Sequence, residues 1–315
     1  VRIVNEPTAA ALAYGLGTTG VARTVAVYDL GGGTFDVSIL RVKGNDFDVI
    51  GIGGDDKLGG EDFDKRLIEL INSKLRADSR FSSLNSEHAV HLEQQLKEAA
   101  EAAKKQLSAA DTAEIEIPEA FASDSFYLSI QRTEYEACIR ELIDRSIEVT
   151  SATLKSIKHS VDDIDRLVMV GGSTRIPMIR RLLTEKVCEP YIADNVDEVV
   201  AHGAAILAAS LTSGNESIEQ KGLAPIEVTS ISSHSLGIRA DQDDFAILIP
   251  RGTKLPTSAE KIFTTARHHA DRTDIVVFQG DAKKCSENIC IGGFAVTGIE
   301  RAAAGVPRIN VSFSI

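Results

Sequence analysis

The stretch Tyr28-Asp-Leu-Gly-Gly-Gly-Thr-Phe-Asp36 decides how the first part of the chain folds. Apolar residues on both sides of three glycines predict two strands, over about 24–30 and 34–42, that form a hairpin. Because glycine has no Cβ, the backbone N–H groups of this turn are unobstructed and can surround phosphate oxygens. Taken alone, however, Gly31–Gly33 favour a plain turn in which glycine supplies a positive φ.

The polar residues that flank the glycines favour a phosphate site over a plain turn. Asp29 ends the first strand, where a carboxylate can hold a magnesium ion through its water molecules. Thr34 offers a hydroxyl to a terminal phosphate or to an attacking water, and Asp36 adds a second carboxylate. The hairpin is therefore a candidate site for a magnesium-bound phosphate.

Both helices and strands are predicted around the hairpin, which makes this part of the chain α/β. A capping box formed by Thr133 and Glu136 is expected to begin the longest helix. Periodicity predicts helices over about 7–16, 61–76, 86–108, 133–160, 177–186 and 197–211, and further strands over about 47–52, 113–120, 125–131 and 167–170.

The last third of the chain has a different pattern. Residues 212–222 are rich in Ser, Gly, Asn, Glu and Gln and contain little to bury, so they mark a boundary. Short strand signals follow at about 235–239, 245–249, 262–265, 274–279 and 291–296, which predicts an all-β sandwich. We therefore expect one domain over 1–211, a linker over 212–232 and a second domain over 233–315.

Charge and hydropathy exclude two classes of partner. The net charge is -12, and the excess of acidic residues lies within 1–223. Nucleic acid is an unsuitable partner for such a surface, because phosphate binding needs a cationic face that releases counterions. No stretch approaches the roughly 18 apolar residues of a membrane span, so we expect no membrane partner and assign a cytoplasmic location by default.

Two further patterns combine polar or charged residues at suggestive spacings. Glu101, Lys104, Lys105 and Ser108 are spaced so that most lie on one helical face, although such a set alone is better explained as a solvated charged face. Val170-Gly-Gly-Ser-Thr-Arg-Ile-Pro177 predicts a strand, a glycine turn and a helix start. Its glycines let a base or a ribose approach the backbone, and the arginine can stack on an aromatic ring.

Five motifs in order resemble those of the DnaK-type seventy-kilodalton heat-shock chaperones, and the resemblance covers the whole chain. They are Asn5-Glu-Pro-Thr-Ala-Ala-Ala11, Asp29-Leu-Gly-Gly-Gly-Thr-Phe-Asp36, Leu58-Gly-Gly-Glu-Asp-Phe-Asp64, Val170-Gly-Gly-Ser-Thr-Arg-Ile-Pro177 and Ser235-Leu-Gly-Ile238. The resemblance implies the second lobe of an actin-like ATPase, with a short first-lobe remnant at 1–16. A β-sandwich that holds extended hydrophobic peptides would follow, and ATP would control peptide affinity.

The resemblance also assigns residues. Catalytic roles fall to Glu6, Asp29 and Thr34, with Asp29 and Glu6 near magnesium. Contacts to ATP or ADP fall to Gly31, Gly32, Gly33, Thr34, Glu101, Lys104, Lys105, Ser108, Gly171, Gly172, Ser173, Arg175 and Asp197. Contacts to peptide fall to Ile238, Ala266, Thr273 and Ile275. Asp29 would hold magnesium through water. A J-domain co-chaperone and a nucleotide-exchange factor are the expected partners, besides extended peptide segments.

The sequence also departs from this family. The linker stretch 226–230 has fewer aliphatic residues than is usual, and Thr273 stands where an aliphatic residue is usual, which indicates a divergent member. Strand patterns at both ends look cut. The resemblance then implies that the first nucleotide-binding lobe and the C-terminal part are missing, and we expect the 315 residues alone to be inactive as an ATPase. The alternatives are another actin-like or sugar-kinase-type ATPase, and a chaperone relative that acts as a nucleotide-exchange or holding module.

Overall fold

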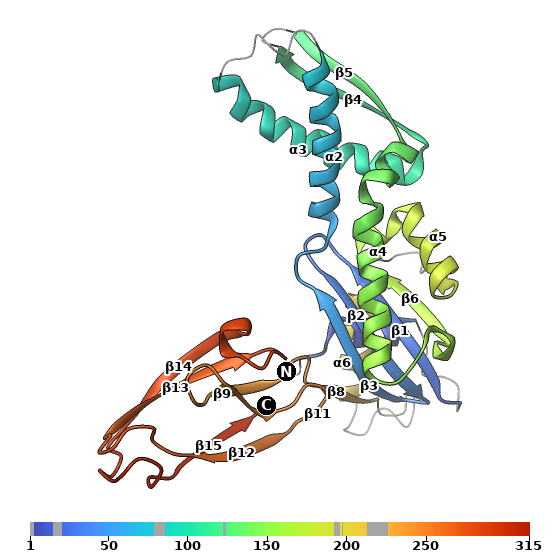
Figure 1. Ribbon diagram of the computed structural model, residues 1–315. Coiled ribbons are helices and arrows are strands. Elements are labelled where there is room, and N and C mark those ends of the chain that lie inside the picture. Colours follow the sequence, from blue (N-terminus) through green and yellow to red (C-terminus); the bar gives the residue numbers. More distant parts are fainter. Residues whose placement is uncertain are drawn as a thin grey trace. The chain divides into compact units, whose positions relative to one another are not determined.

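The computed structural model describes residues 3–14, 21–78, 86–121, 124–191, 196, 198–212 and 226–315. The chain forms two compact units (Figure 1). Unit 1 comprises Val1–Phe47 and Gly53–Ile226, and unit 2 comprises Asp48–Ile52 and Glu227–Ile315.

Unit 1 is organised around a mixed sheet with the strand order β3-β2-β1-β6-β7. The strands are β1 (Arg23–Leu30), β2 (Phe35–Lys43), β3 (Asp46–Asp55), β6 (Arg166–Val170) and β7 (Pro190–Tyr191). The predicted hairpin is present, since β1 pairs antiparallel with β2 up to Leu30 and Phe35. The last strands of the sheet run parallel to β1, because helical segments connect them.

Helices and a separate two-stranded sheet complete unit 1. The helices are α1 (Glu6–Ala13), α2 (Gly60–Ala77), α3 (Ser86–Ala109), α4 (Arg132–Ser156), α5 (Pro177–Lys186) and α6 (Val199–Thr212), and the small sheet pairs β4 (Thr112–Phe121) with β5 (Asp124–Gln131). In α2 the apolar residues recur every three or four positions, so Phe63, Leu67, Ile71 and Leu75 are all buried. Figure 1 shows α2, α3 and the β4–β5 hairpin together, with α4 running from them along the sheet.

The start of α4 lies within one residue of the prediction, but the predicted capping box of Thr133 and Glu136 is wrong. The helix begins at Arg132, directly after β5, and the backbone N–H of Gln131 donates to Glu134 Oε2 at 3.0 Å. Glu136 is instead buried and accepts a hydrogen bond from Arg181 Nη2 at 2.7 Å. Because the chain turns from strand to helix without a loop, the capping carboxylate lies two residues earlier than the sequence pattern suggested.

Unit 2 contains strands and one short 3-10 turn, η5 (Cys285–Glu287), in its described part. A four-stranded sheet has the order β10-β9-β13-β14, and β12 pairs with β15 in a second sheet. These strands are β9 (Leu236–Arg239), β10 (Phe245–Ile249), β12 (Ser258–Phe263), β13 (Arg272–Gln279), β14 (Ile289–Thr297) and β15 (Ile309–Ser314). Both sheets contribute to one core around Ile238, Leu248, Ile275 and Val311.

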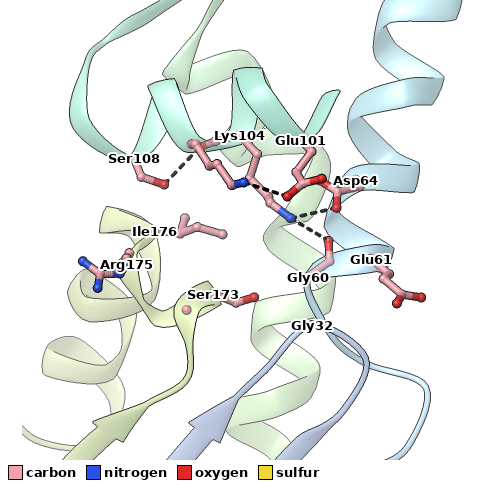
Figure 2. Close-up of a pocket in the computed structure, with 12 residues that line it drawn as sticks. Gly32, Gly60, Glu61, Asp64, Glu101, Lys104, Ser108, Ser173, Arg175 and Ile176 are labelled. Carbon is pink, nitrogen blue, oxygen red and sulfur yellow. Dashed lines mark hydrogen bonds and ion pairs between the residues drawn. The ribbon is translucent and has the colours of Figure 1, made fainter. Parts of the chain in front are cut away.

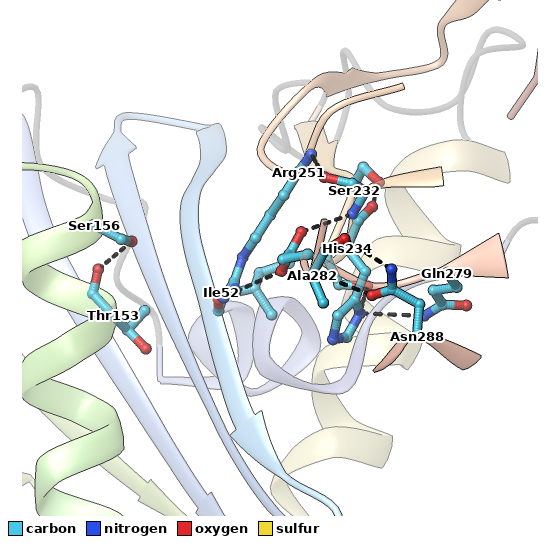
Figure 3. Close-up of polar contacts among 12 residues, drawn as sticks. Ile52, Thr153, Ser156, Ser232, His234, Arg251, Gln279, Ala282 and Asn288 are labelled. Carbon is cyan, nitrogen blue, oxygen red and sulfur yellow. Dashed lines mark hydrogen bonds and ion pairs between the residues drawn. The ribbon is translucent and has the colours of Figure 1, made fainter. Parts of the chain in front are cut away.

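Two local features of unit 2 were not expected. Glu227–Ile231, assigned to the linker from sequence, form strand β8, which pairs antiparallel with β11 (Lys254–Leu255). Between β13 and β14, the amide of Asn288 closes the turn by accepting from the backbone N–H of Ala282 at 3.0 Å and donating to its carbonyl at 2.8 Å (Figure 3). Side-chain hydrogen bonds therefore define a turn that hydrophobic periodicity cannot register.

Candidate functional site

The glycine turn between β1 and β2 is open on its outer side. The backbone N–H of Gly31 donates to the carbonyl of Thr34 at 3.1 Å and closes the turn. None of Gly31–Gly33 has a positive φ, and a Cβ at Gly32 or Gly33 would meet nothing within 4 Å. The plain-turn explanation is therefore wrong, because neither backbone conformation nor packing among the described residues requires glycine there. The glycines leave space in front of the turn.

The N-terminus of α2 packs directly on this turn. Gly60 N donates to Gly31 O at 3.0 Å and Glu61 N donates to Gly32 O at 2.8 Å. A Cβ at Gly59 would lie 2.5 Å from Gly32 O, so only glycine permits this approach. The positive end of the α2 dipole consequently lies beside the hairpin.

The loop after β6 approaches the hairpin from the other side. Gly171 has a φ of +87°, and a Cβ there would lie 2.4 Å from Leu30 O. Ser173 Oγ donates to Gly31 O at 2.8 Å. The hydroxyl that was expected to contact nucleotide is thus used to hold the hairpin.

These contacts form one side of a cavity of about 620 Å³. The residues predicted on α3 lie on one wall, and Ser173 and Arg175 from η4 (Gly172–Arg175) lie on the opposite wall (Figure 2). The lining comprises Gly32, Gly60, Glu61, Asp64, Glu101, Lys104, Lys105, Ser108, Gly172, Ser173, Arg175 and Ile176. A second cavity of about 570 Å³ shares Lys105, Ser108, Arg175 and Ile176 with the first.

The two lysines of α3 that line the cavity differ in how far their side chains are buried. Lys104 Nζ pairs with Asp64 Oδ2 at 2.7 Å and donates to Gly60 O at 3.3 Å, and its side chain is 16% exposed. Lys105 pairs with Glu101 at 2.7 Å, but its side chain is 72% exposed. Lys104 therefore ties α3 to the start of α2, whereas Lys105 has room to turn toward a ligand.

Three carboxylates gather beside the glycine turn of the hairpin. Burial, with the charges of Glu6 and Asp36, raises the pKa of Asp29 to about 6. Burial also raises the pKa of Asp36, against a hydrogen bond from Thr34 that lowers it. A divalent cation would relieve this repulsion. In the described part of the chain, no three His, Cys, Asp or Glu side chains could hold a metal ion directly.

Sequence reasoning missed part of the lining. Gly60, Glu61 and Asp64 belong to a motif that carried the resemblance but received no role, and Ile176 follows Arg175 directly. The glycine pair at the start of a helix was the sequence feature that could have identified Gly60, Glu61 and Asp64 as lining residues. Asp197 lies outside the described residues.

The four residues predicted to contact peptide do not gather around one cavity. Ile238 and Ile275 are buried in the core of unit 2, whereas Ala266 is exposed and Thr273 is half-buried. A cavity of about 540 Å³ in this unit is lined mainly by apolar side chains of β13, β14 and β15, including Ile275 and Phe294. None of the helices described is long and apolar enough to cross a membrane.

Comparisons with known proteins identify the family of the chain. A family model described as "Hsp70 protein" matches residues 1–315. The chain is 40% identical over 321 residues to "Chaperone protein DnaK" of Thermotoga neapolitana and of Thermotoga maritima, which covers 100% of this chain and 53% of each relative. The chain thus spans about half the length of these curated relatives.

The mixed sheet, the glycine hairpin and the matched family model define a protein with an actin-like ATPase fold. Within that class, the chain belongs to the Hsp70 family as a DnaK-type member.

Proposed function

We propose that the full-length protein is an ATP-dependent chaperone whose nucleotide lies in the cavity of unit 1. The observation that carries this proposal is the convergence of α3 and η4 on opposite walls of one cavity that opens beside the glycine turn. A nucleoside needs facing walls that its base and ribose can contact, and phosphates need free backbone amides nearby. This cavity offers both within a few residues of the hairpin.

Each group of residues takes one part of the nucleotide. Gly31–Gly33 leave room for the phosphates at the turn amides, and the Thr34 hydroxyl faces the terminal phosphate or the attacking water. Lys105 and Arg175 supply cations beside the base. Glu101, Ser108, Gly172 and Ser173 shape the walls, and Gly171 brings the loop after β6 onto the hairpin. Asp197, which lies outside the described residues, would contact the base by the family relation.

Magnesium would be held near Asp29 and Glu6 through water. The raised pKa of Asp29 supports this role, because a buried carboxylate beside like charges gains most from a cation. The ion would neutralise charge on the phosphates. The protein's own part is to keep Asp29 fixed at the end of β1.

We propose that unit 2 is a β-sandwich that holds extended hydrophobic peptides, with ATP binding and hydrolysis controlling their affinity. Its two sheets share an apolar core, and its cavity is lined largely by apolar side chains, which suits hydrophobic peptide. By the family relation, a J-domain protein and a nucleotide-exchange factor would be its partners.

Two substitutions in the full-length protein test the nucleotide assignment. Arg175→Ala should weaken nucleotide binding about tenfold, since it removes a cation from the base side. Thr34→Ala should lower kcat roughly 10–100-fold with a small change in Kd, since its hydroxyl acts at the reacting phosphate. Fluorescent-nucleotide titration and single-turnover hydrolysis measure the two effects.

Arg140→Ala is the matched control, because Arg140 pairs with Asp144 on the surface of α4 and does not line the cavity. The proposal fails if Arg140→Ala and Arg175→Ala weaken binding equally. Nucleotide binding without measurable turnover by the wild-type protein would instead identify a nucleotide-exchange or holding module.

A further inference from the structure

The end of β1, which leads into the glycine turn, makes a buried polar contact with α4. Tyr28 is fully buried, and because side chains alternate along a strand it lies on the face of the sheet opposite Asp29. Its hydroxyl is 2.5 Å from Oγ of Ser146 on α4, which is also fully buried. Two hydroxyls therefore meet in a core whose neighbouring side chains include Val37 and Ile143.

The direction of this hydrogen bond follows from the hydrogens available. A serine hydroxyl has one hydrogen to donate. Ser146 donates it to the backbone carbonyl of Ile143 at 2.6 Å. Tyr28 is therefore the donor and Ser146 the acceptor, so the two bonds form a chain from the side chain of a strand residue into the backbone of α4.

The ring of Tyr28 joins both strands below the glycine turn. It packs on the ring of Phe35, which is fully buried, with the two centroids 4.6 Å apart. Tyr28 lies near the end of β1, and Phe35 is the first residue of β2. A bond that fixes Tyr28 against α4 thus also restrains, through Phe35, the second strand end from which the turn projects.

The hydroxyl of Tyr28 is not needed to fill the core. A phenylalanine would occupy nearly the same volume, and a buried pair of hydroxyls gives little net stability because both groups lose their contacts with water. A fully satisfied buried polar contact does define one relative position of the elements that it joins. Its effect here is to fix the end of the hairpin relative to α4.

We propose that Tyr28 is a positioning residue for the phosphates of the nucleotide: its hydroxyl, donated to Ser146, keeps the amides of the glycine turn in place. Tyr28 does not line the cavity itself. The α3 wall is held separately, by the pair of Lys104 and Asp64 at 2.7 Å. Loss of the hydroxyl should therefore weaken contacts to the phosphates and leave contacts to the nucleoside intact. This inference rests on the proposed function of the cavity.

The test is Tyr28→Phe in the full-length protein, which removes one hydroxyl and leaves Ser146 bonded to Ile143. We expect Kd for fluorescent ADP to rise about fivefold, the equivalent of one net hydrogen bond. Kd for adenosine, measured by competition, should stay within twofold of the wild-type value. Ser146→Ala should separate the two ligands in the same way, and adding Tyr28→Phe to Ser146→Ala should weaken ADP binding no further.

Thr150→Val is the matched control, because Thr150 is also fully buried on α4 but donates to Ser146 O within the helix, at 2.9 Å. Its Kd values for both ligands should stay within twofold of wild type. Weakening of ADP and adenosine by the same factor in Tyr28→Phe would indicate a general loss of structure and overturn the inference. A Kd for ADP within twofold of wild type, or additive effects of Tyr28→Phe and Ser146→Ala, would also overturn it. If the wild type and Thr150→Val bind neither ligand, the proposed function itself fails, and the inference falls with it.

Discussion

The cavity of unit 1 and the cavity of unit 2 are similar in volume, about 620 and 540 Å³, but they are built differently. The first depends on close backbone approaches at Gly59 and Gly171 and is lined by many polar and charged groups. The second depends on apolar side chains spread along three strands. A single substitution should disrupt a cavity whose shape depends on close backbone contacts. A cavity formed by many packed side chains should change only slightly with each substitution.

The strongest test of this difference replaces one glycine in each unit. Gly171→Ala forces a Cβ to within 2.4 Å of Leu30 O at a φ of +87°. We expect a loss of roughly 3 kcal/mol or more in unfolding free energy and loss of nucleotide binding, because strain and a backbone clash add. Urea denaturation and nucleotide titration of the full-length protein measure both.

Gly292→Ala is the matched change in unit 2. Its φ is +153°, but a Cβ there meets nothing within 4 Å, so we expect conformational strain alone, about 1 kcal/mol, with nucleotide binding unchanged. Equal losses for the two substitutions would contradict the proposed difference between the units.

The difference between close backbone contacts and distributed side-chain packing also explains which parts of the structure the sequence could predict. Hydrophobic periodicity locates α5 correctly at Pro177–Lys186 and places β1 and α2 to within one residue, because each buries a regular apolar face. Glycine motifs point to the cavity of unit 1, since few other residues tolerate such close approaches. Lys104 and Ser173 both line this cavity, but their hydrogen bonds within the protein depend on elements distant in sequence.

In unit 2, residue type alone could not distinguish a peptide cleft from a hydrophobic core. Ile238 and Ile275 are apolar, as both a peptide cleft and a hydrophobic core require, and the structure places both in the core. Strand β8 is short and half-buried, so it lacked a clear alternation. The turn held by Asn288 depends on side-chain hydrogen bonds that periodicity does not report.

A second test uses one aspartate from each unit. The pKa of Asp29 rises from 3.8 to about 6, so the folded state binds its proton more tightly and stability is lost as pH rises through this window. Asp29→Asn should therefore raise the unfolding free energy at pH 7 without magnesium by roughly 1–3 kcal/mol, and should change little near pH 3. Urea denaturation across this pH range measures the effect.

Asp281 in unit 2 should behave in the opposite way. Burial raises its pKa, but hydrogen bonds from Ser235 N and Arg251, each 3.1 Å, outweigh burial and lower it. Stability from this group is present above its ordinary pKa and is lost as pH falls, so Asp281→Asn should destabilise the protein at pH 7. If both substitutions changed the unfolding free energy at pH 7 in the same direction, the carboxylates of unit 1 would not be destabilised by burial and mutual repulsion.

The smallest expected effect concerns peptide binding in unit 2. Thr273 lies two residues before Ile275 on β13, so the two side chains share a face of the sheet, and Thr273 is half-buried opposite Val296. A hydroxyl there lowers the apolar character next to the cavity, and burying it without a partner costs roughly 1–3 kcal/mol.

Thr273→Val in the full-length protein should therefore tighten binding of a leucine-centred peptide by up to about tenfold in a fluorescence-anisotropy titration. Thr229→Val on β8 is the control, because Thr229 is also half-buried but lies outside the four-stranded sheet that contains Thr273 and Ile275. Equal effects of the two substitutions would place the peptide elsewhere in unit 2, whereas tightening by Thr273→Val alone would show that graded side-chain chemistry sets the affinity of this unit.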